Sequence, residues 1–269
     1  MKNLKQKLKD ELTEFKLLLR ATPTVITAVF IISVFAMNLL ANKSIELPVD
    51  WLALDAGIIV SWFAFLTMDI LTKHFGPKAA TQISILALGV NLVFCLIFFI
   101  ASVIVGSWGA SFDDIGAADS INTALNTTFG GTWYVLLGSS IAFVASTLVN
   151  NFANFGIGKL FKKHPDGATA YFLRAYVSTA IGQFCDNLIF AFIVSYNFFG
   201  WTPLQCVTCA LPGMLVELLC EVIFSYFGFL VCKRLRRDNV GKEYFEFVAN
   251  RKAQKAALET TPESNTDCK

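Results

Sequence analysis

The sequence predicts an all-α integral membrane protein with six transmembrane helices and both termini in the cytoplasm. Of its 269 residues, 55% are hydrophobic and only 16% are charged, whereas a soluble domain carries about 25% charged residues. The charged residues are also clustered, and the apolar runs between them are as long as the roughly 18 residues that cross a bilayer as a helix. The net charge of +2 is too small to indicate a nucleic-acid partner.

The chain divides into three segments by its apolar pattern. In residues 1–20, Leu4, Leu8, Leu12, Phe15 and Leu19 recur at helical spacing between lysines, which predicts a cytoplasmic amphipathic helix on the membrane surface. Residues 21–235 form the predicted six-helix membrane domain, with spans at roughly 21–41, 56–74, 78–106, 131–160, 171–196 and 203–232. Residues 236–269 lose the apolar run, so we expect a frayed cytoplasmic tail there.

The charges of the connecting segments predict the orientation. Basic residues follow the second, fourth and sixth spans: Lys73, Lys78, Lys159, Lys162, Lys163, Arg174, Lys233, Arg234, Arg236 and Arg237. The alternate loops hold one basic residue against five acids: Lys43, Glu46, Asp50, Asp113, Asp114 and Asp119. Short loops rich in Lys and Arg stay in the cytoplasm, so residue 164 is expected inside. The acidic loop 107–130 is expected outside, as a short helix over the outer mouth.

Polar side chains inside the predicted spans are the candidate site. A carboxylate at bilayer depth costs about 2.5–3.5 kcal/mol on insertion scales, so such residues are a functional hypothesis by default. The candidates lie on spans two, four, five and six: Asp69, Asn154, Gln183, Asp186, Asn187, Glu217 and Glu221. No Lys or Arg lies within a span core. We therefore expect these side chains to line a cavity that accepts hydrogen-bond donors or cations.

Several of these polar residues also have a structural explanation. Asp69 lies about one turn from the cytoplasmic end of its span, where it can pair with Lys73 at i+4, cap a helix or act at a gate. The amides of other spans are interpreted as hydrogen-bonding neighbouring helices together: Asn38, Gln82 and Asn91. Rings able to flank a flat ligand are Phe184, Phe190 and Trp62.

The sequence offers little for a cofactor, a metal or an enzyme. Cys206 and Cys209 form a lone CxxC, and the only histidines are His74 and His164, so a zinc site lacks its remaining ligands. The chain contains neither GxxxxGKS nor a GxSxG elbow. We expect no cofactor and no catalytic residues. An intramembrane enzyme is the rival of another class, and transport by the purified protein in liposomes would exclude it.

Two motifs of this chain resemble those of a known family. LPVDW is followed by a span that ends FLTMDILTKHFGPKAA and by a third span closing at GSW. The family pattern at the end of span two is matched by Asp69, Thr72, Phe75 and Gly76, while Met68 replaces a threonine. The signature of span five is matched by Arg174, Ala175, Ser178, Asp186, Asn187 and Phe190. In these motifs the chain resembles the queuosine-precursor transporters, also called the vitamin uptake transporter family, and the resemblance covers roughly residues 35–235.

The resemblance implies a multi-pass importer in the bacterial inner membrane for 7-deazaguanine compounds (preQ0, preQ1 or queuine) that feed tRNA modification. It implies a fold similar to the substrate-binding subunits of energy-coupling-factor transporters. Asp186 would accept both donors of a guanine-like edge, with Asn187 and Gln183 beside it and Glu217 meeting an aminomethyl cation. Some relatives carry Asp near Asn154 and Lys near Glu217, and these departures favour a cationic or larger ligand.

The partners expected are therefore a nucleobase-like small molecule and the lipid bilayer, with no nucleic acid. An alternative is the substrate-binding subunit of an energy-coupling-factor transporter for another vitamin. Such subunits often carry an alanine-rich contact motif on span one, where this chain has Ala28, Ala36 and Ala41 but no A-x-x-x-A. This favours a transporter that requires no ATPase partner. The sequence leaves a homodimer open.

Overall fold

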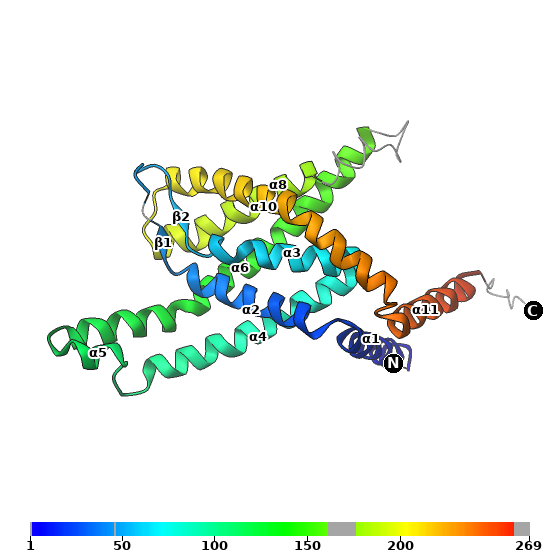
Figure 1. The fold of residues 1–269 in the computed structure, drawn as a ribbon, viewed down its shortest axis with the longest axis horizontal. Helices are drawn as coiled ribbons and strands as arrows, with labels where there is room; N and C mark the ends of the chain where they lie inside the picture. The colour runs from blue at the N-terminus through cyan, green and yellow to red at the C-terminus, as the bar shows by residue number, and fades with distance from the viewer. Residues whose placement is uncertain (1, 46, 161–175, 261–269) are drawn as a thin grey trace, which may run out of the picture.

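The computed structural model describes the chain except residues 1, 46, 161–175 and 261–269 (Figure 1). The longer helices are α1 (Lys2–Ala21), α2 (Thr24–Leu40), α3 (Ile58–Phe75), α4 (Pro77–Val103), α6 (Ala118–Leu160), α8 (Ser178–Phe190), α10 (Pro203–Arg237) and α11 (Lys242–Thr260). The short elements are β1 (Ser44–Ile45), β2 (Leu54–Asp55), α5 (Ala110–Asp113), the 3₁₀ turn η1 (Ile115–Ala117), the π-helix η3 (Ala191–Ser195) and α9 (Tyr196–Phe198).

The described residues contain five helices long and apolar enough to cross a bilayer, in the segments Ile58–Phe75, Pro77–Val103, Ile115–Asn150, Ser178–Phe198 and Pro203–Phe224. A sixth is obtained if α1 and α2, which meet at 102°, count as one broken span. α2 alone has 17 residues, the lower end of the spanning range. The bend falls at Pro23, which has no N–H to continue the ladder of α1. The chain is thus a predominantly helical membrane protein.

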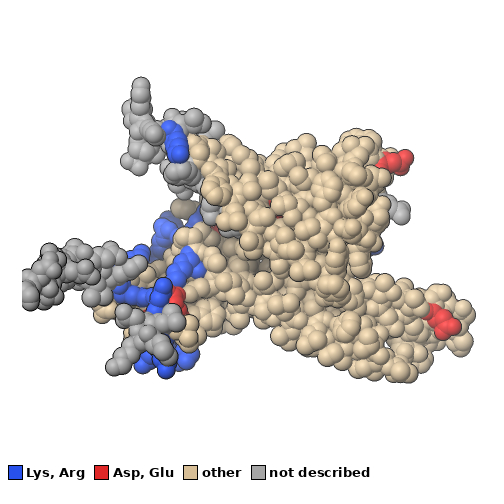
Figure 2. All heavy atoms as spheres, turned by 180° about the vertical axis from the view of Figure 1, so that it is seen from behind, with Lys and Arg blue, Asp and Glu red and all other residues tan. Residues whose placement is uncertain are grey.

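The helices form a bundle in which α6 packs on α4 and α8, α10 packs on α3 and α8, and α2 packs on α3 and α4 (Figure 1). The antiparallel pair β1–β2 closes one end of the bundle, with Ser44 opposite Asp55 and Ile45 opposite Leu54. Lys and Arg gather at the other end of the visible face, near α1 and α11, while acids mark the far tips (Figure 2). The orientation inferred from loop charge stays a prediction.

The acidic loop expected at 107–130 is mostly helix. Residues 118–130 continue the fourth span as part of α6, and α4 and α6 form a long hairpin with α5 at its tip (Figure 1). The turn is held by Trp108, whose backbone N–H donates to Asn122 Oδ1 at 2.7 Å and whose Nε1 donates to Asn126 Oδ1 at 2.8 Å. The expected short helix is therefore present as α5, whereas most of this segment extends the fourth span as part of α6; a position over the outer mouth stays a prediction.

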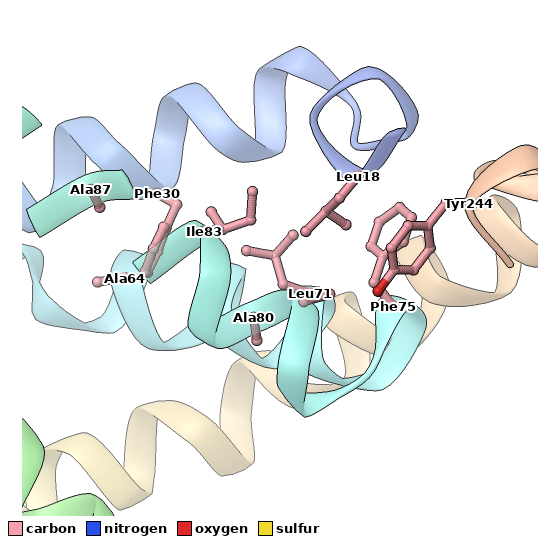
Figure 3. Packing of buried hydrophobic residues seen from close by; sticks show 10 residues of the cluster. Leu18, Phe30, Ala64, Leu71, Phe75, Ala80, Ile83, Ala87 and Tyr244 are labelled. Carbon is pink, nitrogen blue, oxygen red and sulfur yellow. The ribbon is translucent and has the colours of Figure 1, made fainter. Parts of the chain in front are cut away.

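The expectation of a frayed tail is wrong for residues 242–260, which form α11. α11 packs against α1, and Tyr244 joins a buried cluster with Leu18 of α1, Leu71 and Phe75 of α3 and Ile83 of α4 (Figure 3). This apolar contact fixes both terminal helices to the same end of the bundle.

Charged side chains complete that junction in a group that we call the Glu14 cluster: Glu11, Glu14, Lys78 and Arg251. The Glu14 side chain is only 2% exposed. Lys78 Nζ donates to Glu14 Oε1 at 2.7 Å, and Arg251 donates to the other oxygen, Oε2. Arg251 also donates to Glu11 Oε1 at 2.7 Å. A buried carboxylate is thereby matched by two cations from two different helices.

We predict that Arg251→Met destabilises the protein, because Glu14 keeps only one of its two cations. Hydrogen bonds to charged groups contribute about 1.5–3 kcal/mol each, so the melting temperature in detergent should fall clearly. Arg237→Met is the matched control, since the Arg237–Asp238 pair is exposed and such pairs add little. Equal melting temperatures for the two variants would contradict the role given to the Glu14 cluster.

The orientation predicts which sites an impermeant thiol reagent reaches. Ile115 is 86% exposed at the tip of the α4–α6 hairpin, and Lys252 is exposed on α11. In a background with Cys268 replaced by serine, Ile115→Cys should be labelled in intact cells and Lys252→Cys only after permeabilisation. The reverse pattern would overturn the inference from loop charge.

Candidate functional site

Two cavities lie end to end between α2, α3, α6, α8 and α10. The hairpin cavity, about 140 Å³, lies beneath β2 and is lined by Asn38, Asp55, Ser195, Trp201 and others. The Asp69 cavity, about 350 Å³, lies toward the opposite end and is lined by Asp69, Thr72, Asn150, Gln183 and others. Four residues line both cavities: Phe65, Phe143, Asp186 and Glu217. These four residues therefore stand at the junction between the cavities.

Helical spacing explains why these residues meet. Residues three or four positions apart share one face of a helix, and each lining helix contributes one such face. On α6 the face is Ser139, Phe143, Ser146 and Asn150. On α8 it is Thr179, Gln183, Asp186 and Phe190, and on α10 it is Cys209, Gly213 and Glu217.

Asp186 of α8 is half-buried at the junction. Ser146 Oγ of α6 donates to Asp186 Oδ1 at 2.9 Å. Among the described residues that line the two cavities there is no Lys or Arg, so this carboxylate faces the cavities without a cation. An ionised carboxylate can accept about four hydrogen bonds, so Asp186 has capacity left for a ligand's donors.

Glu217 of α10 is 8% exposed and is tied to α8 through an amide. Asn187 Nδ2 donates to Glu217 Oε2 at 3.2 Å and to the Gln183 carbonyl at 3.0 Å. Gly213 makes room for this amide, because a Cβ there would come within 3.1–3.3 Å of the Asn187 side chain. The carboxyl groups of Asp186 and Glu217 are close enough to interact electrostatically, which favours a cationic or donor-rich occupant.

Several buried polar atoms around the cavities have no hydrogen-bond partner in the described part of the chain. They are Asn38 Nδ2 and Ser195 Oγ in the hairpin cavity and Asn150 Oδ1 and Gln183 Oε1 in the Asp69 cavity. Buried polar groups are normally paired with protein or water, so these atoms are candidates for ligand contacts. Asn38 was expected to hydrogen-bond a neighbouring helix, and its free Nδ2 corrects that expectation. The side-chain atoms Gln82 Oε1 and Asn91 Nδ2 are likewise unpaired.

The π-helix η3 places Ala191 and Ser195 on the hairpin cavity. Such turns are rare in proteins and are frequent at functional sites. Carbonyl groups of this segment find side-chain donors: Tyr134 Oη donates to Ile193 O at 2.8 Å, and Asn197 Nδ2 donates to Phe192 O at 3.1 Å. These contacts stabilise the irregular turn without using Ser195 Oγ.

Asp55 is a site residue that the sequence analysis missed, because it lies one residue before the expected start of span two. Its Oδ1 accepts from Gly57 N at 2.8 Å. Gly57 must be glycine for this contact, since a Cβ there would lie 2.7 Å from Asp55 Oδ1 and 2.8 Å from Met37 O. Burial raises the pKa of Asp55 to about 6.

The aromatic lining differs in part from the expectation. Phe190 lines the hairpin cavity as expected. Trp62 instead stacks on Phe63 and Phe224, at centroid distances of 3.4 and 4.4 Å, and neither Trp62 nor Phe184 is among the described lining residues. The rings that the sequence analysis overlooked line the cavities: Phe65, Phe143 and Trp201.

The remaining candidates fall in two places. Asp69 lines the Asp69 cavity and pairs with Lys73 Nζ at 2.5 Å, so the i+4 pair foreseen for it is present. Gln183 lines the same cavity, and Asn187 lines the hairpin cavity. Asn154 lies on α6 and Glu221 on α10, but their side chains lie outside the described part of the structure.

Comparison with known proteins identifies the family of this chain. A family model described as "Putative vitamin uptake transporter" matches residues 55–231, which is more than half of the chain and includes the seven candidates on spans two, four, five and six. The chain belongs to this vitamin uptake transporter family. The match begins at Asp55 and ends within α10, so it contains most of the residues around both cavities. The expected family membership is confirmed.

One relative carries a more specific name than the family does. The "Probable queuosine precursor transporter" of Bacillus subtilis (strain 168) is 29% identical over 153 residues, which are 57% of this chain and 60% of that protein. The match thus spans less than two thirds of that relative. No solved structure matches the chain.

Proposed function

We propose that this transporter imports queuosine precursors, 7-deazaguanine compounds used in tRNA modification, across the bacterial inner membrane. The observation that carries the proposal is the Asp186 carboxylate at the junction of two cavities whose described lining has no cation. A guanine-like edge presents a ring N–H and an amino group side by side, and a carboxylate accepts both as a bidentate pair. The name of the B. subtilis relative supports the same ligand class.

The surroundings of Asp186 suit a flat heterocycle. Phe65 and Phe143 line both cavities at the level of Asp186, and aromatic rings favour stacked or edge-on contacts with flat ligands. Ser146 fixes one carboxylate oxygen, so the orientation of Asp186 is set before the ligand arrives. Gln183 Oε1, buried and unpaired, is a further acceptor next to it on α8.

The two cavities support a transport cycle with one central site. Transporters of several folds bind substrate near the bilayer midplane and open the site to each side in turn. Here the hairpin cavity and the Asp69 cavity meet at the same four residues, so a ligand at Asp186 lies between two routes. We place Asp69 and its partner Lys73 at the gate of the second route. The protein works as an autonomous importer, without an ATPase partner and without nucleic acid.

The family description favours a second candidate, the uptake of another vitamin, either alone or as the substrate-binding subunit of an energy-coupling-factor transporter. A thermal-shift screen of the purified protein against deazapurines and common vitamins separates the two. A specific ligand raises the melting temperature as its concentration exceeds Kd.

We predict that Asp186→Asn weakens binding of 7-deazaguanine ligands by about tenfold to a hundredfold, or roughly 1.4–2.7 kcal/mol. The amide replaces one acceptor with a donor that opposes the ligand's N–H. Because asparagine still offers Oδ1 to Ser146 and removes a costly buried charge, the ligand-free variant should melt at the same or a higher temperature. Titration calorimetry and thermal melts measure both effects.

The control is Asp119→Asn, which removes an exposed acid near the hairpin tip and should leave binding unchanged. Normal ligand binding by Asp186→Asn would show that this residue does not hold the ring edge of the ligand. A variant that fails to fold would show instead that Asp186 is structural.

A separate prediction concerns Asp69. Asp69→Asn should slow uptake into liposomes, because the pair with Lys73 is lost at the gate, and it should leave equilibrium binding within about tenfold. Lys73→Met, which breaks the same pair from its other side, should have a similar effect on the transport rate. Complete loss of binding by a folded Asp69→Asn protein would place Asp69 in direct contact with the ligand.

A further inference from the structure

Acidic residues lie at both ends of the hairpin cavity. Asp186 and Glu217 stand where it meets the Asp69 cavity, while Asp55 stands on β2 at the hairpin end. The β1–β2 ladder and the hydrogen bond from Gly57 N hold the Asp55 carboxylate in place. Its position is therefore built into the fold rather than left to a mobile side chain.

The charge of this cavity is unbalanced. Three carboxylates face it, and its described lining includes no Lys or Arg. Glu217 lies within the electrostatic influence of both Asp186 and Asp55. Buried acids in membrane proteins normally pair with a cation or mark a substrate route. One positive charge on the occupant would reduce this repulsion.

A second observation points independently to a ligand. Asn38 Nδ2 and Ser195 Oγ line the same cavity without hydrogen-bond partners in the described structure, and their residues are only 4% and 1% exposed. An amide N–H₂ donates but cannot accept, so Asn38 requires an acceptor such as a ring carbonyl. The cavity thus offers acceptors at its two ends and a donor on its wall.

An aromatic face adjoins the Asp55 end. Trp201 is 6% exposed and lines the cavity, and its Nε1 donates to Ser44 Oγ at 3.2 Å. Ser44 is the residue paired with Asp55 across the hairpin, so the indole is anchored next to the carboxylate. Tryptophan faces attract organic cations.

We propose that Asp55 forms a second substrate subsite, which binds an ammonium group on the end of the substrate opposite the edge held by Asp186. The inference rests on the proposed function and specifies its substrate class: a flat 7-deazaguanine with a primary ammonium on the five-membered ring. That ring lies at the far end of the bicycle from the aminopyrimidine edge. The ligand therefore spans the cavity from Asp186 to Asp55.

Asp55 suits the ammonium better than Glu217, which the sequence analysis had assigned to it. Glu217 Oε2 already accepts from Asn187 Nδ2. Glu217 also lies beside Asp186 at the junction of the cavities, where the ring edge itself binds. Among the described acids that line the hairpin cavity, Asp55 is the one that does not line the Asp69 cavity as well, so it suits a group at the opposite end of the ligand.

The preference for an ammonium ligand depends on pH. With a pKa of about 6, Asp55 is charged at pH 7.5 and mostly neutral at pH 5. Affinity for the cationic ligand should fall as the pH decreases through this range. The titratable groups facing Asp55 are Cys209 and Glu217 on α10 and Asp186 on α8. Titration of these groups changes the affinity of two ligands with the same ring edge to a similar extent. The ratio of the two affinities therefore isolates the effect of Asp55.

The test compares two ligands of equal ring structure, 7-aminomethyl-7-deazaguanine and 7-cyano-7-deazaguanine, by calorimetry on the full chain in nanodiscs. The wild type should bind the aminomethyl ligand at least about tenfold more tightly, a difference of about 1.4 kcal/mol. Asp55→Asn keeps Oδ1 for Gly57 N. This variant should bind the aminomethyl ligand about tenfold more weakly than the wild type does. Its affinity for the cyano ligand should stay within about threefold of the wild-type value. Asp50→Asn, an exposed acid of the same connection, should change neither.

The outcomes separate the two proposals. If the wild type binds neither deazaguanine but does bind another vitamin, the proposed function fails. If the wild type binds both ligands equally, or Asp55→Asn weakens both equally, the Asp55 subsite is refuted while the function stands. Binding that requires Na⁺, with the requirement lost in Asp55→Asn, would make Asp55 a metal-cation site and overturn the subsite. If Asp55→Asn does not fold, the wild-type affinity ratio at pH 7.5 and pH 5 decides, and an unchanged ratio refutes the proposal.

Discussion

A carboxylate in a low-dielectric interior must be compensated, and this molecule compensates its acids in two ways. Glu14 is matched permanently, with Lys78 and Arg251 each donating to one of its oxygens. Within the described residues, Asp186 and Glu217 receive neutral donors, a serine hydroxyl and an asparagine amide. The first arrangement fixes the terminal helices to the bundle. The second leaves charge uncompensated in the place where two cavities meet, which is the arrangement that a passing ligand can complete.

Close approach between helices makes this second arrangement possible. A Cβ on Gly213 would press on the Asn187 amide, and a Cβ on Gly182 would lie 3.0 Å from Asn150 Cβ. Small residues at such crossings are the usual means by which membrane helices pack tightly. The glycines of α8 and α10 thus bring the polar faces of α6, α8 and α10 together, and Phe65 of α3 and Phe143 of α6 line the cavities beside them.

The spans, and the convergence of Asp186 and Glu217 on a cavity, could be predicted from sequence. Apolar run length marks the helices, and polar residues buried among apolar ones mark a functional site. Asp55 could not, since an acid just outside a span resembles any loop acid until the β1–β2 pairing turns it toward the cavity. Nor could α11 be foreseen: its sequence is polar, and it is fixed in place by contacts between Arg251 and Glu14, 237 positions apart. Asn38 was expected to bond a neighbouring helix but lines the hairpin cavity. Sequence spacing alone does not show whether a side-chain amide faces another helix or a cavity.

The junction of α1 and α11 can form only late in synthesis of the chain. The ribosome makes the chain from its N-terminus, so Glu14 emerges first, Lys78 after the second span and Arg251 only after the last. Until that moment the carboxylate lacks its second cation and the aromatic face of Tyr244. Closure of this end of the bundle therefore cannot be completed before α11 has been made, and a chain that stops short of α11 leaves the Glu14 cluster and the apolar surface around Leu18 incomplete.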